Sequence, residues 1–168
     1  MPTTVAGRFT DVQDPFFSYI RDITYATMVT VDRRNRPRAR VLLPVWEVVD
    51  DRPVGWLASY RTPVKSAHLA ANPHTTYSYW SPRQNALHID AVSTWAASEA
   101  DKRHAWDLYV QGSPPGVGYD PAHYWRGGVE DPGYDVIRID PWRVQLVRGS
   151  DLRSTVWTAP SGSRERTA

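Results

Sequence analysis

The chain of 168 residues has the size of one domain, long enough to bury a hydrophobic core without disulfides or a structural metal. It contains no cysteine, which excludes disulfides, thiolate zinc sites and cysteine nucleophiles and fits a reducing compartment. The net charge is only +2, and no stretch has the apolar length of a signal peptide or a membrane span, so we expect a cytoplasmic protein with no membrane partner. We expect one domain over residues 1–160 and a disordered tail over residues 161–168.

The first half of the chain predicts a helix, three strands and a second helix. Asp14-Pro15 is a helix cap followed by a proline, and apolar residues then recur at helical spacing to about residue 25. Short β-branched and apolar runs, separated by turn-forming residues, predict three sequential antiparallel strands over residues 26–31, 39–50 and 54–59. Thr62-Pro63 repeats the cap signal and opens a short helix that stops at Asn72-Pro73.

The second half predicts four more strands around a third helix. Two strands are expected over residues 75–80 and 87–95, and Ser98 with Asp101 resembles a capping box that opens a helix ending at Gly112. Residues 113–133 are rich in Pro and Gly and predict a loop with one turn of helix over residues 120–125. Final strands are expected over residues 134–139 and 144–147. This order favours a mostly antiparallel barrel with peripheral helices over a parallel sheet.

The basic residues are unevenly distributed. Of the 20 basic residues, only Lys65 and Lys102 are lysines, and arginines gather at residues 33, 34, 36, 38 and 40. Such a cluster can contact nucleic acid, bind an anionic ligand or lie solvated on a hairpin, and the solvated hairpin is the default. Because the cluster lacks the aromatic residues that stack on nucleic-acid bases, we expect no nucleic-acid partner.

The segment from Ser59 to Lys65 places hydroxyl groups and cations around a helix N-terminus. Its polar members are Ser59, Arg61, Thr62 and Lys65. Free amides and the positive end of the helix dipole make such a terminus a favourable phosphate-binding site, and flanking cations add charge-assisted hydrogen bonds. A lysine there opposes the dipole by about 0.3–1 kcal/mol, so an anion between them explains it better. A surface lysine with a solvated head group is an equal alternative.

The alternation of the second strand places Arg38, Arg40 and Leu42 on one face and Ala39, Val41 and Leu43 on the other. If the third strand and its following helix pack beside this strand, Arg40 and Lys65 converge on one phosphate. The alternative is that both strand arginines are simply exposed.

Two segments together resemble the FMN-binding core of the pyridoxamine-phosphate-oxidase-like superfamily. They are NRPRARVLLPVWE at residues 35–47 and GWLASYRTPVKSAHLAANP at residues 55–73. In that family a strand arginine, a hydroxyl at the next strand end and a basic residue in the short helix before an Asn-Pro hold the FMN phosphate. The resemblance implies an antiparallel split β-barrel and a homodimer with the cofactor at its interface.

The resemblance also implies which residues bind the flavin. Arg40 and Lys65 hold the phosphate, with Ser59 and Thr62 as hydroxyl donors. Nearby on the strand it places Arg38 and Leu42, and it runs the main chain of Val41, Leu42 and Leu43 along the isoalloxazine ring. A polar residue from the partner subunit reaches the flavin, and Gln84 and Asn85 both match its position.

The sequence departs from the true pyridoxamine phosphate oxidase. Residues 124–128, YWRGG, are reminiscent of a stretch near that enzyme's C-terminus, but its Arg-x-His-x-Arg substrate signature is replaced by VEDPGYDVIRID. We therefore expect an FMN-dependent oxidoreductase with another small-molecule substrate. The alternatives are an F420-dependent reductase on the same fold, with the acidic tail of F420 along residues 33–38, and a flavin-binding module without enzymatic activity.

The remaining motifs exclude several classes of site. The five histidines lack metal-ligand spacing, so we expect no metal, and the sequence has neither a GxSxG elbow nor a GxGxxG loop. No residue is marked as a catalytic acid or base, and a flavin enzyme does not require one. His88 in a strand and Trp125 in the long loop are candidates for a substrate pocket, with structural packing as the alternative for each.

Overall fold

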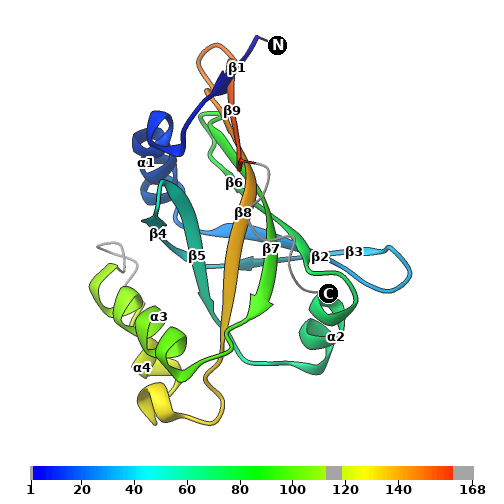
Figure 1. The fold of residues 1–168 in the computed structure, drawn as a ribbon, viewed down its shortest axis with the longest axis vertical. Coiled ribbons are helices and arrows are strands. Elements are labelled where there is room, and N and C mark those ends of the chain that lie inside the picture. Colours follow the sequence, from blue (N-terminus) through cyan, green and yellow to red (C-terminus); the bar gives the residue numbers. More distant parts are fainter. Residues whose placement is uncertain (1, 113–118, 161–168) are drawn as a thin grey trace.

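The computed structural model describes residues 2–112 and 119–160 and shows a nine-stranded sheet with helices at its periphery (Figure 1). The expected disordered tail and residues 113–118 of the long loop lie outside the described residues. The elements, in chain order, are β1 (Thr3–Ala6), the 3₁₀ helix η1 (Phe9–Asp11), α1 (Gln13–Ile23), β2 (Ala26–Val31), β3 (Pro37–Leu42), β4 (Val45–Val49), β5 (Arg52–Ala58), α2 (Pro63–Ala71), β6 (His74–Trp80), β7 (Ala86–Trp95), α3 (Glu99–Gly112), α4 (Pro121–Tyr124), the 3₁₀ helix η2 (Gly128–Glu130), β8 (Val136–Val147) and β9 (Ser154–Thr158).

The sheet follows the strand order β1-β9-β8-β7-β6-β2-β3, and the β4–β5 pair joins it where β5 pairs with β8. Among the strand pairings of the described residues, only that of β1 with β9 is parallel. The strands β4 and β5 thus branch from a long path of strands that is antiparallel except at its β1 end. The predicted fold class, mostly β with peripheral helices in a split barrel, is confirmed.

The expected strand over residues 39–50 is wrong, because the structure divides it into β3 and β4 at Leu43-Pro44. Proline has no amide hydrogen for a sheet, and both Leu43 and Pro44 are buried, so the chain turns there inside the fold. β3 then pairs with β2, whereas β4 pairs with β5. The expected sequential antiparallel pairings are present, β2 with β3 and β4 with β5, but the middle strand is divided between them. On its other side β5 pairs with β8.

The expected strands over residues 134–139 and 144–147 form one strand, β8, that spans both. Ala91 pairs with Pro141 and Asp90 with Arg143, so Trp142 has no partner on β7 and forms a bulge. The bulge lets the strand continue past a proline. The strands β1 and β9 at the two ends of the chain were not predicted. The four predicted helical segments are present as α1, α2, α3 and α4 within a few residues of their expected bounds.

The hydrophobic core has two parts on opposite sides of β5. Inside the barrel, edge-to-face aromatic contacts link Phe9 to Phe16 (5.2 Å) and Phe16 to Trp46 (5.6 Å between ring centroids). Gly55 lies under the Trp46 ring, where a Cβ atom would come within 2.7 Å of it. The second part packs α3 against β5, and the buried Tyr109 hydroxyl donates to the Leu43 carbonyl over 2.6 Å.

Candidate functional site

The first turn of α2, after the loop from β5, directs the side chain of Lys65 into the interior of the protein. Thr62 caps α2, and its hydroxyl accepts the Lys65 amide over 3.4 Å, which fixes the first helical turn. The Lys65 side chain is only 7% exposed, and its Nζ donates to Ser59 Oγ and, over 3.3 Å, to the Tyr60 carbonyl. None of the ion pairs among the described residues involves Lys65. Burial lowers the pKa of Lys65, and the positive charge of Arg40 lowers it further.

Arg40, on β3, lies near the Lys65 ammonium. Its Nη1 donates to Thr30 Oγ1 over 3.0 Å, and that hydroxyl bonds to His68 Nδ1 over 2.9 Å. Because a guanidinium only donates, Thr30 accepts from Arg40 and can give its own proton to His68. Burial lowers the pKa of Arg40, and the neighbouring Arg38 adds to the effect. Two partly buried cations thus lie close together without a carboxylate between them.

Arg40 lies near enough to Lys65 for its charge to lower the Lys65 pKa, but the two residues are brought together by a different route from the predicted one. The sequence made their convergence depend on β5 and α2 packing beside β3, which the strand order contradicts. Instead α2 lies against β2, the strand between β3 and β6, and the contact from Thr30 to His68 fastens it there. Sequence reasoning missed Thr30 and His68. The helical spacing of Lys65 and His68, three residues apart, was the signal that could have indicated His68.

The other predicted phosphate ligands differ in how they are placed. Ser59 is buried next to the Lys65 ammonium, and Thr62 caps the helix. Arg61 is instead paired with Asp135 over 2.6 Å and lies over the Trp95 ring, 4.6 Å from its centroid. Since its guanidinium already has a carboxylate partner, Arg61 is the weakest of the predicted phosphate ligands.

The predicted division of β3 into two faces is present at the C-terminal end of the strand, at Val41 and Leu42. Leu42 packs against the barrel core, whereas Val41 on the opposite face is 66% exposed. Arg38 shares the face of Arg40 but is exposed, because β3 there runs out beyond the body of the sheet (Figure 1). Leu43 is buried, and its carbonyl accepts the Tyr109 hydroxyl.

Gln84 and Asn85 form the turn between β6 and β7. Asn85 Oδ1 accepts the Gly149 amide over 2.8 Å, which leaves Gln84 as the exposed side chain of the two, with a positive φ of 63°. This turn lies at the opposite end of the sheet from α2 (Figure 1). Within one chain the two residues therefore lie away from Arg40 and Lys65. A contact with the flavin from here would have to be made across subunits.

The two candidates for a substrate pocket have structural contacts. Ser78 Oγ lies 3.0 Å from His88 Nδ1, and burial lowers the pKa of this half-buried histidine. Trp125 is only 3% exposed and donates its indole N–H to the Gly133 carbonyl over 3.0 Å. It belongs to the core beneath α3 and packs against the Tyr60 and Tyr134 rings, 5.2 Å from each centroid. The exposed aromatic residues beside it are Tyr60 and Tyr124.

Residues 2–112 and 119–160 contain neither a candidate metal site nor a candidate membrane span. No three side chains of histidine or acidic residues come together there in a way that could hold a metal ion. None of the helices in this part of the chain combines the length and the apolar composition needed to cross a bilayer.

Comparison with solved structures supports the description of the fold. Neither a family model nor a curated protein sequence matches the chain. A Clostridium acetobutylicum protein related to general stress protein 26, of the pyridoxinephosphate oxidase family, superposes with a TM-score of 0.67 at 13% identity over 88% of this chain and 94% of its own. A pyridoxamine 5'-phosphate oxidase-related, FMN-binding protein of Nostoc punctiforme gives 0.58 at 14% identity over 89% and 97% of the two chains.

The same fold also occurs in a protein with a different described role. HutZ, the heme storage protein of Vibrio cholerae, superposes with a TM-score of 0.56 at 13% identity, over 77% of this chain and 89% of its own. At such identities a likeness concerns the fold. The strand order, the peripheral helices and these superpositions agree, and the chain has the split-barrel fold of the proteins related to pyridoxamine 5'-phosphate oxidase.

Proposed function

We propose that the chain binds FMN, with the FMN phosphate between Lys65 and Arg40, and acts as a flavin-dependent oxidoreductase on a small molecule. The observation that carries the proposal is the burial of the Lys65 ammonium next to the Arg40 guanidinium, with only neutral groups as hydrogen-bond partners. Burying a cation without a counter-charge is costly, and a doubly negative phosphate in contact with both groups offsets that cost. We call Lys65, Arg40 and Ser59 the phosphate cradle.

Each residue of the phosphate cradle has a task in this proposal. Lys65 supplies a point charge, and Arg40 supplies N–H groups on the β3 side, in an orientation that Thr30 fixes. The buried Ser59 hydroxyl lies beside the ammonium and adds a neutral polar contact. FMN itself supplies the hydride or electron transfer, so the chain has to bind it, orient its ring and limit access of water.

The cofactor can be tested directly. We expect the purified protein to be yellow and to release FMN on denaturation, identified by mass spectrometry. Fluorescence titration of the apo protein should give tighter binding for FMN than for riboflavin, because riboflavin has the same ring but no phosphate. Equal affinities for the two flavins would contradict the cradle. A colourless protein that binds added F420 and not FMN would favour the F420-dependent reductase instead.

A second candidate is flavin binding without enzymatic activity, which the presence of a heme storage protein on the same fold favours. Reduction of the bound flavin distinguishes the two. An oxidoreductase should pass electrons from a reduced nicotinamide or a similar donor to an acceptor with repeated turnover. A binding module should hold FMN with no turnover above that of free FMN.

FMN binding should weaken as the pH rises in the alkaline range. Burial and the Arg40 charge lower the pKa of Lys65 from its ordinary value of 10.5. The free protein therefore loses the Lys65 proton earlier than an exposed lysine would, and above that point binding a phosphate requires taking the proton up again. The loss is at most about tenfold per pH unit for one proton. Titrations of FMN between pH 7 and pH 10 would measure it.

Two controls separate the effect of Lys65 from other titrations. Riboflavin shares the titrating ring of FMN, and its binding should not follow the phosphate-dependent part of the curve. Lys65→Gln should bind FMN weakly with a flat pH profile. A Lys65→Gln variant with the same slope as the wild type would assign the titration to another group.

We further propose that the chain is a homodimer, with FMN at the interface and Gln84 reaching the partner's flavin. One face of the sheet supports this proposal. On it Val41, Thr27 and Ser78 lie side by side on β3, β2 and β6, and large apolar side chains at both ends of this row are exposed. Val41 is 66% exposed, and Trp80, two residues beyond Ser78 on the same face of β6, is 57% exposed. Apolar side chains gathered on an uncovered sheet face mark an interaction surface.

Sedimentation velocity should show a dimer at micromolar concentration. Trp80→Asp should shift the protein toward monomer and weaken FMN binding together, since the site needs both subunits. Val110→Asp is a matched control, because Val110 is 60% exposed on α3, outside this face. A wild-type monomer that binds FMN fully would contradict the shared site.

A further inference from the structure

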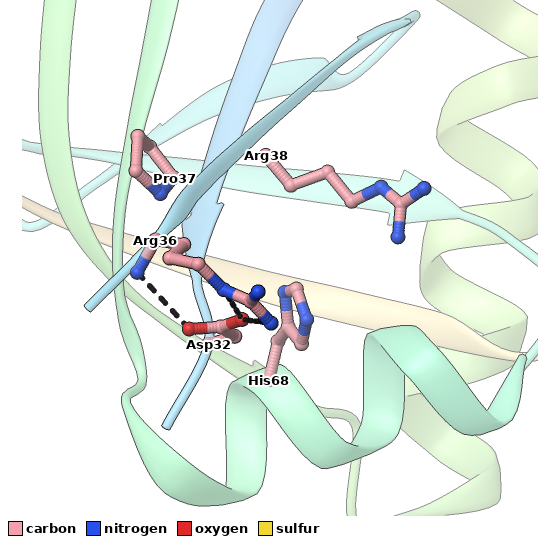
Figure 2. Close-up of a pocket in the computed structure, with 5 residues that line it drawn as sticks. All are labelled: Asp32, Arg36, Pro37, Arg38 and His68. Carbon is pink, nitrogen blue, oxygen red and sulfur yellow. Dashed lines mark hydrogen bonds and ion pairs between the residues drawn. The ribbon is translucent and has the colours of Figure 1, made fainter. Parts of the chain in front are cut away.

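A groove lies between α2 and the loop that joins β2 to β3. It has a volume of ≈ 560 Å³, with an adjoining hollow of ≈ 300 Å³, which is within the range of small-molecule sites. Arg33, Arg34 and Arg36 line the groove, Arg38 lines the hollow, and Asp32 and His68 border both. Figure 2 shows the Arg36 guanidinium between Asp32 and the His68 ring, with Arg38 directed away from Asp32.

Asp32, the acidic residue that lines the groove, does not neutralise the arginines around it. Asp32 binds Arg36 over 2.7 Å, and it also accepts the main-chain amides of Arg34 (2.8 Å) and Arg36 (3.0 Å). These amide bonds and the Arg36 side chain hold the pKa of Asp32 at about 2, so the carboxylate stays ionised and shapes the loop. The ion pairs of the described residues include none for Arg33, Arg34 or Arg38. Three guanidinium groups are therefore left for a ligand.

The segment that lines the groove is far more positively charged than the rest of the chain. Residues 33–40 contain five arginines and no acidic residue, whereas the whole chain has a net charge of only +2, so the rest of the chain carries a net charge of −3. Like charges this close repel one another, and an anion that bridges them relieves the repulsion. Positive charge concentrated around a concave surface also attracts anionic ligands.

The groove is separate from the phosphate cradle. His68 stands between the two: its Nδ1 bonds to Thr30, which holds Arg40, and the histidine also borders the groove. Neither Arg40 nor Lys65 lines the groove or the hollow. A phosphate held by Lys65 and Arg40 thus leaves the groove open to a second anionic group.

We propose that this groove is a second anion site that binds a chain of two or more phosphate or carboxylate groups. Guanidinium groups suit both, since each can give two parallel hydrogen bonds to a phosphate or a carboxylate. FMN ends at its phosphate and does not fill the groove. The anionic chain is either a continuation of the ligand in the cradle, which depends on the function proposed above, or a separate small polyanion.

Calorimetry with tripolyphosphate as the probe, at constant ionic strength, tests the site. We expect FMN-saturated protein to bind one tripolyphosphate per chain, and Arg33→Gln/Arg34→Gln to weaken that binding at least tenfold. FMN affinity should change less than twofold, because these side chains do not belong to the cradle. Asp32 is retained in this variant, so the loop keeps its hydrogen bonds. The control Arg21→Gln/Arg126→Gln removes the same charge from exposed positions on α1 and after α4.

Three results would overturn the proposal. They are an equal loss in the control variant, displacement of tripolyphosphate by FMN, and unchanged affinity in Arg33→Gln/Arg34→Gln. If FMN itself fails to bind, the same titration on apo protein still decides the groove independently of the cofactor. Two further probes identify the source of the anionic chain. Weakened binding of F420 in the groove variant indicates a continuing ligand, and unchanged binding of F420 with loss of tripolyphosphate or triglutamate indicates a separate one.

Discussion

Lys65→Ala should weaken FMN binding ten- to a hundredfold. A hydrogen bond to a charged group contributes about 1.5–3 kcal/mol, which corresponds to that change in the dissociation constant. The structure gives the physical reason, since the Lys65 ammonium is almost buried beside Arg40 and has only Ser59 and the Tyr60 carbonyl as partners. Titration of flavin fluorescence on apo protein measures the effect, and riboflavin binding should change much less.

The chain offers a matched control, because Lys102 is its other lysine. Lys102 pairs with Glu99 on α3 over 3.2 Å, so Lys102→Ala should leave FMN affinity unchanged. Arg40→Ala should resemble Lys65→Ala, and the double variant should lose less than the sum, since both groups act on one phosphate. Wild-type FMN affinity in Lys65→Ala would place the phosphate elsewhere.

The same substitution should not harm the apo protein. Because the folded-state pKa of Lys65 lies below its unfolded value, the unfolded chain holds this proton more tightly. Stability contributed by this group therefore rises with pH through that window and is lowest where Lys65 is fully charged. Removing the ammonium removes this penalty, so we expect apo Lys65→Ala to unfold at no lower urea concentration than the apo wild type at pH 7.

Gly149→Ala should destabilise the fold by about 1–3 kcal/mol, the usual range for forcing extra atoms into a packed site. A Cβ atom at Gly149 would lie 1.9 Å from the Arg83 carbonyl oxygen and 2.7 Å from the Gln84 carbonyl carbon. Both are main-chain atoms, so relief requires moving the turn between β6 and β7. That turn is also fastened by the bond from the Gly149 amide to Asn85. Urea denaturation of the apo protein measures the loss.

Gly112→Ala is the control, because a Cβ atom there meets nothing within 4 Å at the end of α3. It should be neutral or should stabilise the protein, as alanine is favoured over glycine in a helix by about 0.5–1 kcal/mol. If Gln84 reaches the partner's flavin, Gly149→Ala should also reduce FMN affinity, while Gly112→Ala should not. An unchanged unfolding midpoint in Gly149→Ala would show that the turn yields without cost.

The sequence by itself determined the elements whose signals are local. A cap followed by proline indicated where α2 begins, and it placed the start of α1 two residues late, because the structure begins α1 at Gln13 with Val12 as its cap. Short β-branched and apolar runs between turn-forming residues indicated β2, β6 and β7. The mismatch of a cation at the start of α2 singled out Lys65, and the structure shows that cation buried without a carboxylate partner. These features depend on neighbouring residues, so the order of residues along the chain is sufficient to reveal them.

Only the tertiary structure decided how distant segments pair. The pairing of β5 with β8 and the strands β1 and β9 depend on partners far along the chain. The break at Leu43-Pro44 has a local cause, the proline, which the sequence prediction passed over. The sequence anticipated that Arg40 and Lys65 could meet, but it gave the wrong reason, because Thr30 and His68 join α2 to β2 and not to β3. The groove between α2 and the β2–β3 loop follows from the same contact. Strand pairing is set by which faces bury together, and residue propensities do not encode this, since a strand has the same alternation whichever neighbour it pairs with.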